Sequence, residues 1–114
     1  IVLISVLIEL IFQGERYMIE NIKLIGINEA TIQEMYDVLG YDIVLNMACN
    51  YETVKQNINL LKSFGINNIK QLLLNRESIF LMNNEELLKK FSKYNIPSLV
   101  NLINDDYTVV DEFL

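Results

Sequence analysis

The side chains in this sequence that could do chemistry are mostly basic, and they lie in the middle of the chain. Seven Lys and Arg residues and only four Asp and Glu residues lie between positions 50 and 93, whereas both flanking segments are acidic. A basic band on a folded surface can bind phosphates or an acidic partner protein. The residues that we single out for such binding are Lys55, Lys62, Arg76, Lys89 and Lys93. The alternative interpretation is that they form the solvated side of amphipathic helices.

Other functional chemistry has little support in the sequence. The chain contains no His, which removes histidine metal sites and the Ser-His-Asp and Cys-His nucleophile systems. Neighbouring carboxylates such as Glu85 and Glu86 point to different sides of a helix and suit its first turn better than a catalytic dyad. Asp105 and Asp106 are interpreted as a helix end or a turn cap. We therefore predict no catalytic residue, no metal site, no cofactor and no enzymatic activity.

Cys49 is the single cysteine, so an intrachain disulfide is impossible. Such cysteine usage is typical of proteins from a reducing cytoplasm, which is the predicted location. No His lies nearby to activate the thiol, and free cysteines are among the most buried residues. We therefore expect Cys49 to be a small buried apolar group.

Composition places the chain among folded proteins with an acidic surface. Its 114 residues suit one domain, and 52% are hydrophobic, which excludes disorder. The net charge of −6 repels nucleic acid and anionic membranes. If the basic band binds a polyanion, it does so against the repulsion from the net negative charge of the chain.

Glycine and asparagine divide the chain into short helical segments. Gly26, Gly40 and Gly65 each follow an apolar helical pattern, where a left-handed residue ends a helix easily. Asn28, Asn50, Asn67, Asn83 and Asn95 each precede a new pattern as predicted N-caps. The predicted helices cover residues 18–25, 29–39, 51–64, 68–75, 84–93 and 96–103, and we interpret residues 41–49, 78–82 and 105–110 as tight turns or single-turn helices.

The second half of the sequence repeats itself. Shifting residues 60–87 by 27 positions gives nine identical pairs, which include Lys62 with Lys89, Phe64 with Phe91, and Leu72 with Leu99. A fixed period of this size is typical of stacked helical units, and such stacking is expected to place Lys62 and Lys89 on one face. A looser unit with uneven spacing precedes these two. The predicted fold is therefore all-α, a compact array of short helix pairs with repeats of about 27–33 residues.

The run from Val54 to Phe80, with its Leu61-Lys62-Ser63-Phe64-Gly65-Ile66 turn, resembles a repeat of the mitochondrial transcription termination factor family. The resemblance covers residues 50–114 and implies a helix, a second helix and a short turn in each unit. It also makes nucleic acid a ligand to consider. The proline usual in that family's third element is missing, with Glu77 and Ser78 in its region. The chain also resembles small uncharacterised proteins of low-GC bacteria, which begin with a sequence like Met18-Ile19-Glu20-Asn21-Ile22-Lys23 and imply no particular activity.

Residues 1–17 form a separate segment, an apolar N-terminal helix ahead of a single helical-repeat domain at residues 18–114. Ser5, Glu9 and Gln13 recur every four residues and give this helix one polar stripe. The run is too short and too charged for a membrane span, so it is expected to pack within the chain or against another copy. A truncated membrane or signal segment is the second interpretation. The third is that translation starts at Met18, because Gln13-Gly14-Glu15 can be encoded by a bacterial ribosome-binding sequence; peptides upstream of Met18 in the endogenous protein would contradict it.

Together these features predict a non-catalytic helical-repeat interaction module that binds a protein partner. The alternative function is nucleic-acid binding through the five basic residues named first. A homo-oligomer through the apolar N-terminal helix stays open, and no membrane span is expected.

Overall fold

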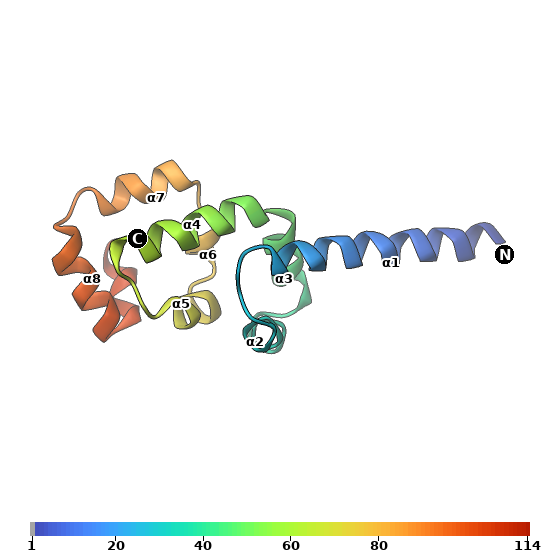
Figure 1. The fold of residues 1–114 in the computed structure, drawn as a ribbon, viewed down its shortest axis with the longest axis horizontal. Coiled ribbons are helices and arrows are strands. Elements are labelled where there is room, and N and C mark those ends of the chain that lie inside the picture. The colour runs from blue at the N-terminus through green and yellow to red at the C-terminus, as the bar shows by residue number, and fades with distance from the viewer. Residues whose placement is uncertain (1) are drawn as a thin grey trace. The chain divides into compact units, whose positions relative to one another are not determined.

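The computed structural model describes the backbone of residues 2–114, with all side chains in that range except those of residues 12 and 14–19. The described residues form helices joined by short turns and contain no strand, which confirms the all-α prediction. The chain divides into two compact units at residues 1–51 and 52–114. Figure 1 shows the helices of each unit.

The first unit contains α1 (Val2–Lys23), α2 (Glu29–Leu39) and α3 (Tyr41–Cys49). Its core gathers one side chain or more from each helix, including Ile22, Met35, Val44 and Met47, all without solvent exposure. These side chains recur at helical spacing, so each helix turns one apolar face inward. The N-terminal turns of α1 extend beyond α2 and α3 (Figure 1). None of the helices among the described residues is both long enough and apolar enough to cross a bilayer.

Two expectations for the first unit were wrong. Residues 41–49 form the nine-residue helix α3 rather than a tight turn or a single-turn helix. Gly40, with a φ of 87°, ends α2 and starts α3 at once, so no longer linker is needed. Residues 18–23 do not start a helix of their own, because α1 runs through the predicted boundary between residues 17 and 18 without a break.

The second unit follows the predicted pattern closely. It contains α4 (Tyr51–Phe64), α5 (Ile69–Asn75), α6 (Ser78–Leu81), α7 (Asn84–Phe91), α8 (Ile96–Asp105) and the 3-10 helix η1 (Tyr107–Glu112). The single-turn α6 and the short η1 confirm the interpretation of residues 78–82 and 105–110. Helix α7 ends at Phe91, two residues earlier than predicted, and Lys93 therefore lies in the turn before α8.

The predicted caps Asn28, Asn83 and Asn95 explain where α2, α7 and α8 begin. The predictions for Asn50 and Asn67 were wrong, because the Asn50 side chain donates back to the Asn46 carbonyl at the end of α3, and Asn68 is the N-cap residue of α5. The Asn83 side chain accepts hydrogen bonds from the backbone N–H groups of Glu85 and Glu86, and Asn95 accepts from that of Ser98. Gly65 has a φ of 100°, a conformation that favours glycine, and there the chain leaves α4. The Asn104 side chain then holds this turn, accepting from the Asn67 N–H at 2.9 Å and donating to the Gly65 carbonyl at 3.1 Å.

The sequence repeat is also a structural repeat, with α4, α5 and α6 followed by α7, α8 and η1. Equivalent residues share their environment in the second helix of each unit, where Leu72 and Leu99 are both buried. They differ in the first helix, because Leu61 is 1% exposed and its equivalent Leu88 is 42% exposed. Helices α4 and α7 therefore use different faces to reach the core.

Candidate interaction surface

Four of the five predicted binding residues are exposed lysines of the second unit. Lys55 and Lys62 lie on α4, Lys89 lies on α7, and Lys93 lies in the turn after α7. Their side chains form no hydrogen bond or ion pair with any residue that the structure describes. We call these four residues the lysine surface. All four residues are exposed and therefore available to an external partner.

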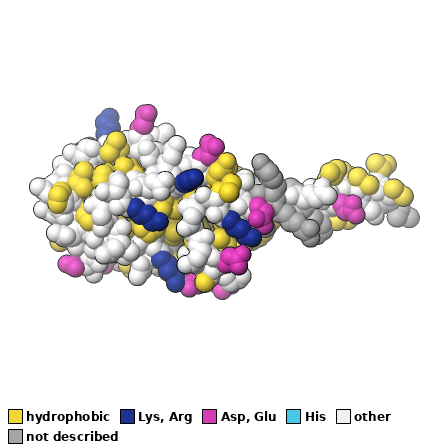
Figure 2. Space-filling view, in the orientation of Figure 1, with side chains coloured by type: hydrophobic (Ala, Val, Ile, Leu, Met, Phe, Trp, Pro, Cys, Tyr) yellow, Lys and Arg dark blue, Asp and Glu magenta, His cyan; other side chains and the backbone are white. Residues whose placement is uncertain are grey.

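The repeat does not bring Lys62 and Lys89 together. The rings of Phe64 and Phe91, two residues after each lysine, contact each other with centroids 5.1 Å apart. Positions two apart on a helix lie about 200° apart around its axis. Each lysine is therefore directed away from the contact between α4 and α7. In the view of Figure 2 the Lys and Arg side chains lie as separate spots, several of them beside Asp or Glu side chains.

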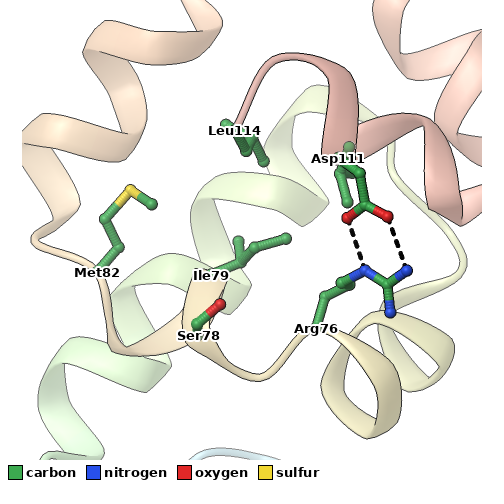
Figure 3. A pocket seen from close by; sticks show the side chains of 7 residues that line it. Arg76, Ser78, Ile79, Met82, Asp111 and Leu114 are labelled. Carbon is green, nitrogen blue, oxygen red and sulfur yellow. Dashed lines mark hydrogen bonds and ion pairs between the residues drawn. The ribbon is translucent and has the colours of Figure 1, made fainter.

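Arg76, the fifth predicted residue, is already paired within the chain. Its Nε donates to Asp111 Oδ1 at 2.7 Å and its Nη2 donates to Asp111 Oδ2 at 2.8 Å (Figure 3). Its Nη1 donates to the Asn75 carbonyl at 2.6 Å, and its guanidinium lies 5.5 Å from the centroid of the Tyr107 ring. Hydrogen bonding to Asp111 raises the pKa of Arg76, and the same bonds lower the pKa of Asp111. Arg76 thus holds η1 against the end of α5.

A hollow of about 190 Å³ lies beside this ion pair. Its apolar lining comes from α6 and Met82 on one side and from the C-terminal residues on the other. The charges at its edge neutralise each other, so the hollow suits a small apolar group better than an ion. The residues that line it are Arg76, Ser78, Ile79, Met82, Val110, Asp111 and Leu114.

The remaining polar groups near the hollow have structural roles. Lys90 Nζ donates to the Leu114 carbonyl at 3.2 Å, which fastens the C-terminal residues to α7. The Asp106 carboxylate accepts from the hydroxyl and the backbone N–H of Thr108, and these bonds lower the pKa of Asp106. Asp106 is therefore the N-cap of η1, as its interpretation as a turn cap predicted.

The other candidate groups for chemistry are dispersed. Among the described residues, no cluster of three or more His, Cys, Asp or Glu side chains could hold a metal ion. The predicted burial of Cys49 was wrong, because Cys49 is exposed. It is the last residue of α3, where Val44, Met47 and Ala48 already occupy the face toward the core.

Sequence reasoning missed the most connected polar residue of the second unit. Asn57 lies on α4 without solvent exposure, and its Nδ2 donates to the carbonyls of Phe80 at 2.9 Å and Met82 at 2.7 Å. Its Oδ1 accepts from Nδ2 of Asn84 at 3.0 Å. The signal was present in the sequence, because Asn57 falls in the apolar stripe between Val54 and Leu61. A polar residue in such a stripe indicates a buried hydrogen-bond network.

No protein-family model, curated protein or solved structure matches this chain. The surface that its residues build consists of exposed lysines on a scaffold held by buried amide hydrogen bonds.

Proposed function

We propose that this chain is a non-catalytic interaction module of the bacterial cytoplasm that binds an acidic protein partner through the lysine surface. The observation that carries the proposal is that Lys55, Lys62, Lys89 and Lys93 are exposed, and no described residue holds any of them. Paired lysines serve internal stability, whereas these four are free to meet carboxylates of another protein.

The surroundings of the lysine surface support a protein partner. Tyr94 is 46% exposed and Leu88 is 42% exposed, and each adjoins one of the lysines in sequence. Protein interfaces combine apolar or aromatic side chains with polar groups at their edges. The buried hydrogen bonds of Asn57 hold α4, α6 and the start of α7 in place, so the surface is presented by a defined scaffold.

Nucleic-acid binding is the alternative function, and the same four unpaired lysines favour it. Two observations favour protein instead. The net charge of −6 opposes approach to a polyanion, and the basic side chains visible in Figure 2 do not join into one band. Arg76, the basic side chain best suited to a bidentate phosphate contact, is already bound to Asp111.

Affinity capture from the host with and without nuclease tests the proposal. The bait is the full chain, compared with Lys62→Glu/Lys89→Glu and with Lys23→Glu/Lys70→Glu, a control with the same change in charge. Circular dichroism checks that all three are folded. We expect the unaltered chain and the control to retain a partner after nuclease, and the first variant to retain at least about tenfold less, since two charge contacts are reversed.

Two outcomes contradict the proposal. Loss of every captured partner after nuclease would show that the contacts run through nucleic acid. Equal capture by the Lys62→Glu/Lys89→Glu variant would show that the lysine surface is not the contact. Fluorescence anisotropy with single- and double-stranded DNA and RNA at low salt tests the alternative directly. Saturable binding would establish it if the logarithm of the association constant falls linearly with the logarithm of the salt concentration, by about 0.9 per phosphate contact for duplex DNA and about 0.7 for single strands.

A further inference from the structure

The first turns of α1 expose apolar side chains that their own unit does not cover. The exposed fraction is 62% for Ile4, 56% for Leu7 and 60% for Ile11. The other exposed apolar residues of this stretch are Val2, Leu3, Val6, Ile8 and Leu10, with exposed fractions between 47% and 78%. A monomeric protein rarely exposes so continuous an apolar surface. This stretch therefore requires a partner surface.

The spacing of these residues matches helix pairing. Ile4, Leu7 and Ile11 are separated by three and four residues, which places them in one line along α1. We call this line the α1 seam. Its residues correspond to the a, d and a positions of a heptad, and isoleucine at a with leucine at d favours parallel two-stranded coiled coils. Leu3, Ile8 and Leu10 flank the seam at the e and g positions.

The charge pattern fits a second copy of the same chain. Glu9 is the one charged residue among positions 2–11, and its position lies about 140–160° around the helix from each seam residue. Two copies can therefore join their seams without bringing the two carboxylates together. Such a self-complementary surface is what a twofold homodimer needs.

We propose that residues 2–11 of α1 form a parallel, two-stranded helix pair with the same residues of a second copy of this chain. The seam and its flanks account for six of the eight exposed apolar side chains. Pairing them buries on the order of 1,000 Å² in total, near the lower limit for a specific interface. The interface uses no residue of the lysine surface, so it stands apart from the proposed function.

Light scattering and sedimentation over a concentration series test the dimer. The seam variant Leu7→Lys weakens association at least about 100-fold, because it places two ammonium groups opposite each other in the pair. Val2→Lys is the matched control on the far side of the helix and leaves the dissociation constant within about threefold. A monomer at all concentrations, or a seam variant that associates as the unaltered chain does, overturns the proposal.

Mixing two variants keeps the proposal testable even if single changes disturb the protein. In a parallel pair Leu7 faces its own equivalent, so Leu7→Lys and Leu7→Glu are each monomeric alone and form a one-to-one dimer when mixed. Absence of that mixed dimer overturns the parallel pairing. Phosphatidylcholine vesicles provide the competing apolar surface. The dimer proposal is overturned if the unaltered chain is monomeric and cosediments with these vesicles, and if Leu7→Lys abolishes the cosedimentation. That result would assign the α1 seam to a membrane surface.

Discussion

Nδ2 of Asn57 lies 2.7 Å from the carbonyl oxygen of Met82, which joins the middle of α4 to the residue that ends α6. A helix of one turn leaves most of its carbonyls without intrahelical partners. Asn57 supplies a donor to this end of α6 from inside the core. The Asn84 side chain in turn donates to Oδ1 of Asn57. The amide thus connects the end of the first repeat to the start of the second.

We expect Asn57→Ala to lower the free energy of unfolding by about 3 kcal/mol, because buried carbonyls lose their donor and a small cavity opens. Urea unfolding followed by circular dichroism measures the change. Asn59→Ala is the control on the exposed side of α4, with an expected change below about 0.5 kcal/mol. Equal effects of the two substitutions would mean that the buried network adds nothing.

The Phe64–Phe91 contact predicts unequal roles for two repeat-equivalent residues. Phe91 is 1% exposed, whereas Phe64 is only partly buried. Phe91→Ala should cost about 3–5 kcal/mol of unfolding free energy, and Phe64→Ala should cost about half as much. Chemical denaturation of both variants decides this. The reverse order would show that α7 reaches the core by another face.

The Arg76–Asp111 pair predicts a dependence of η1 on pH. The pKa of Asp111 is lower in the folded chain than in the unfolded chain, so the ion pair contributes stability above the ordinary carboxyl pKa. This contribution disappears as the pH falls through the lowered pKa. Chemical shifts of Tyr107 should therefore change in the acid range below about pH 4.

Asp111→Asn removes the part of this transition that the ion pair causes, and it lowers the thermal midpoint at neutral pH. The control is Glu112→Gln, which changes the neighbouring exposed carboxylate. If the Tyr107 shifts of Asp111→Asn titrate as in the unaltered chain, another group causes the acid transition.

Exposure of Cys49 predicts rapid thiol labelling without denaturant. Ellman's reagent should react with one thiol per chain, at a rate within about tenfold of that for the chain in urea. If the thiol reacts only after unfolding, Cys49 is buried in the folded chain, as the sequence predicted. Since Cys49 is the single cysteine, no second thiol complicates the measurement.

The sequence predicts the second unit better than the first, for physical reasons. Helices α4, α7 and α8 start or end at residues with strong local preferences, such as Gly65, Asn83 and Asn95, so local chemistry suffices. In the first unit, α3 is a helix because Val44 and Met47 complete a core with α1 and α2. That packing is a tertiary effect, and a short apolar segment does not reveal it.

The candidate site was predicted in part. Exposed lysines follow from the amphipathic pattern of α4 and α7, and Lys55, Lys62 and Lys89 lie on the helices predicted for them. The pairing of Arg76 with Asp111 joins residues 35 positions apart, and no local pattern signals it. The predicted alignment of Lys62 with Lys89 assumed that stacked units repeat the same contact, whereas Phe64 and Phe91 face each other.

The different environments of Leu61 and Leu88 bear on how the two repeats diverge during evolution. Both positions hold leucine, yet only Leu61 is constrained by the interior, so substitutions at Leu88 meet weaker purifying selection. Leu72 and Leu99 are both buried, so each position is held to a narrow range of side-chain sizes. Sequence drift in descendants of this chain would therefore erase the repeat first in its leading helices and last in α5 and α8.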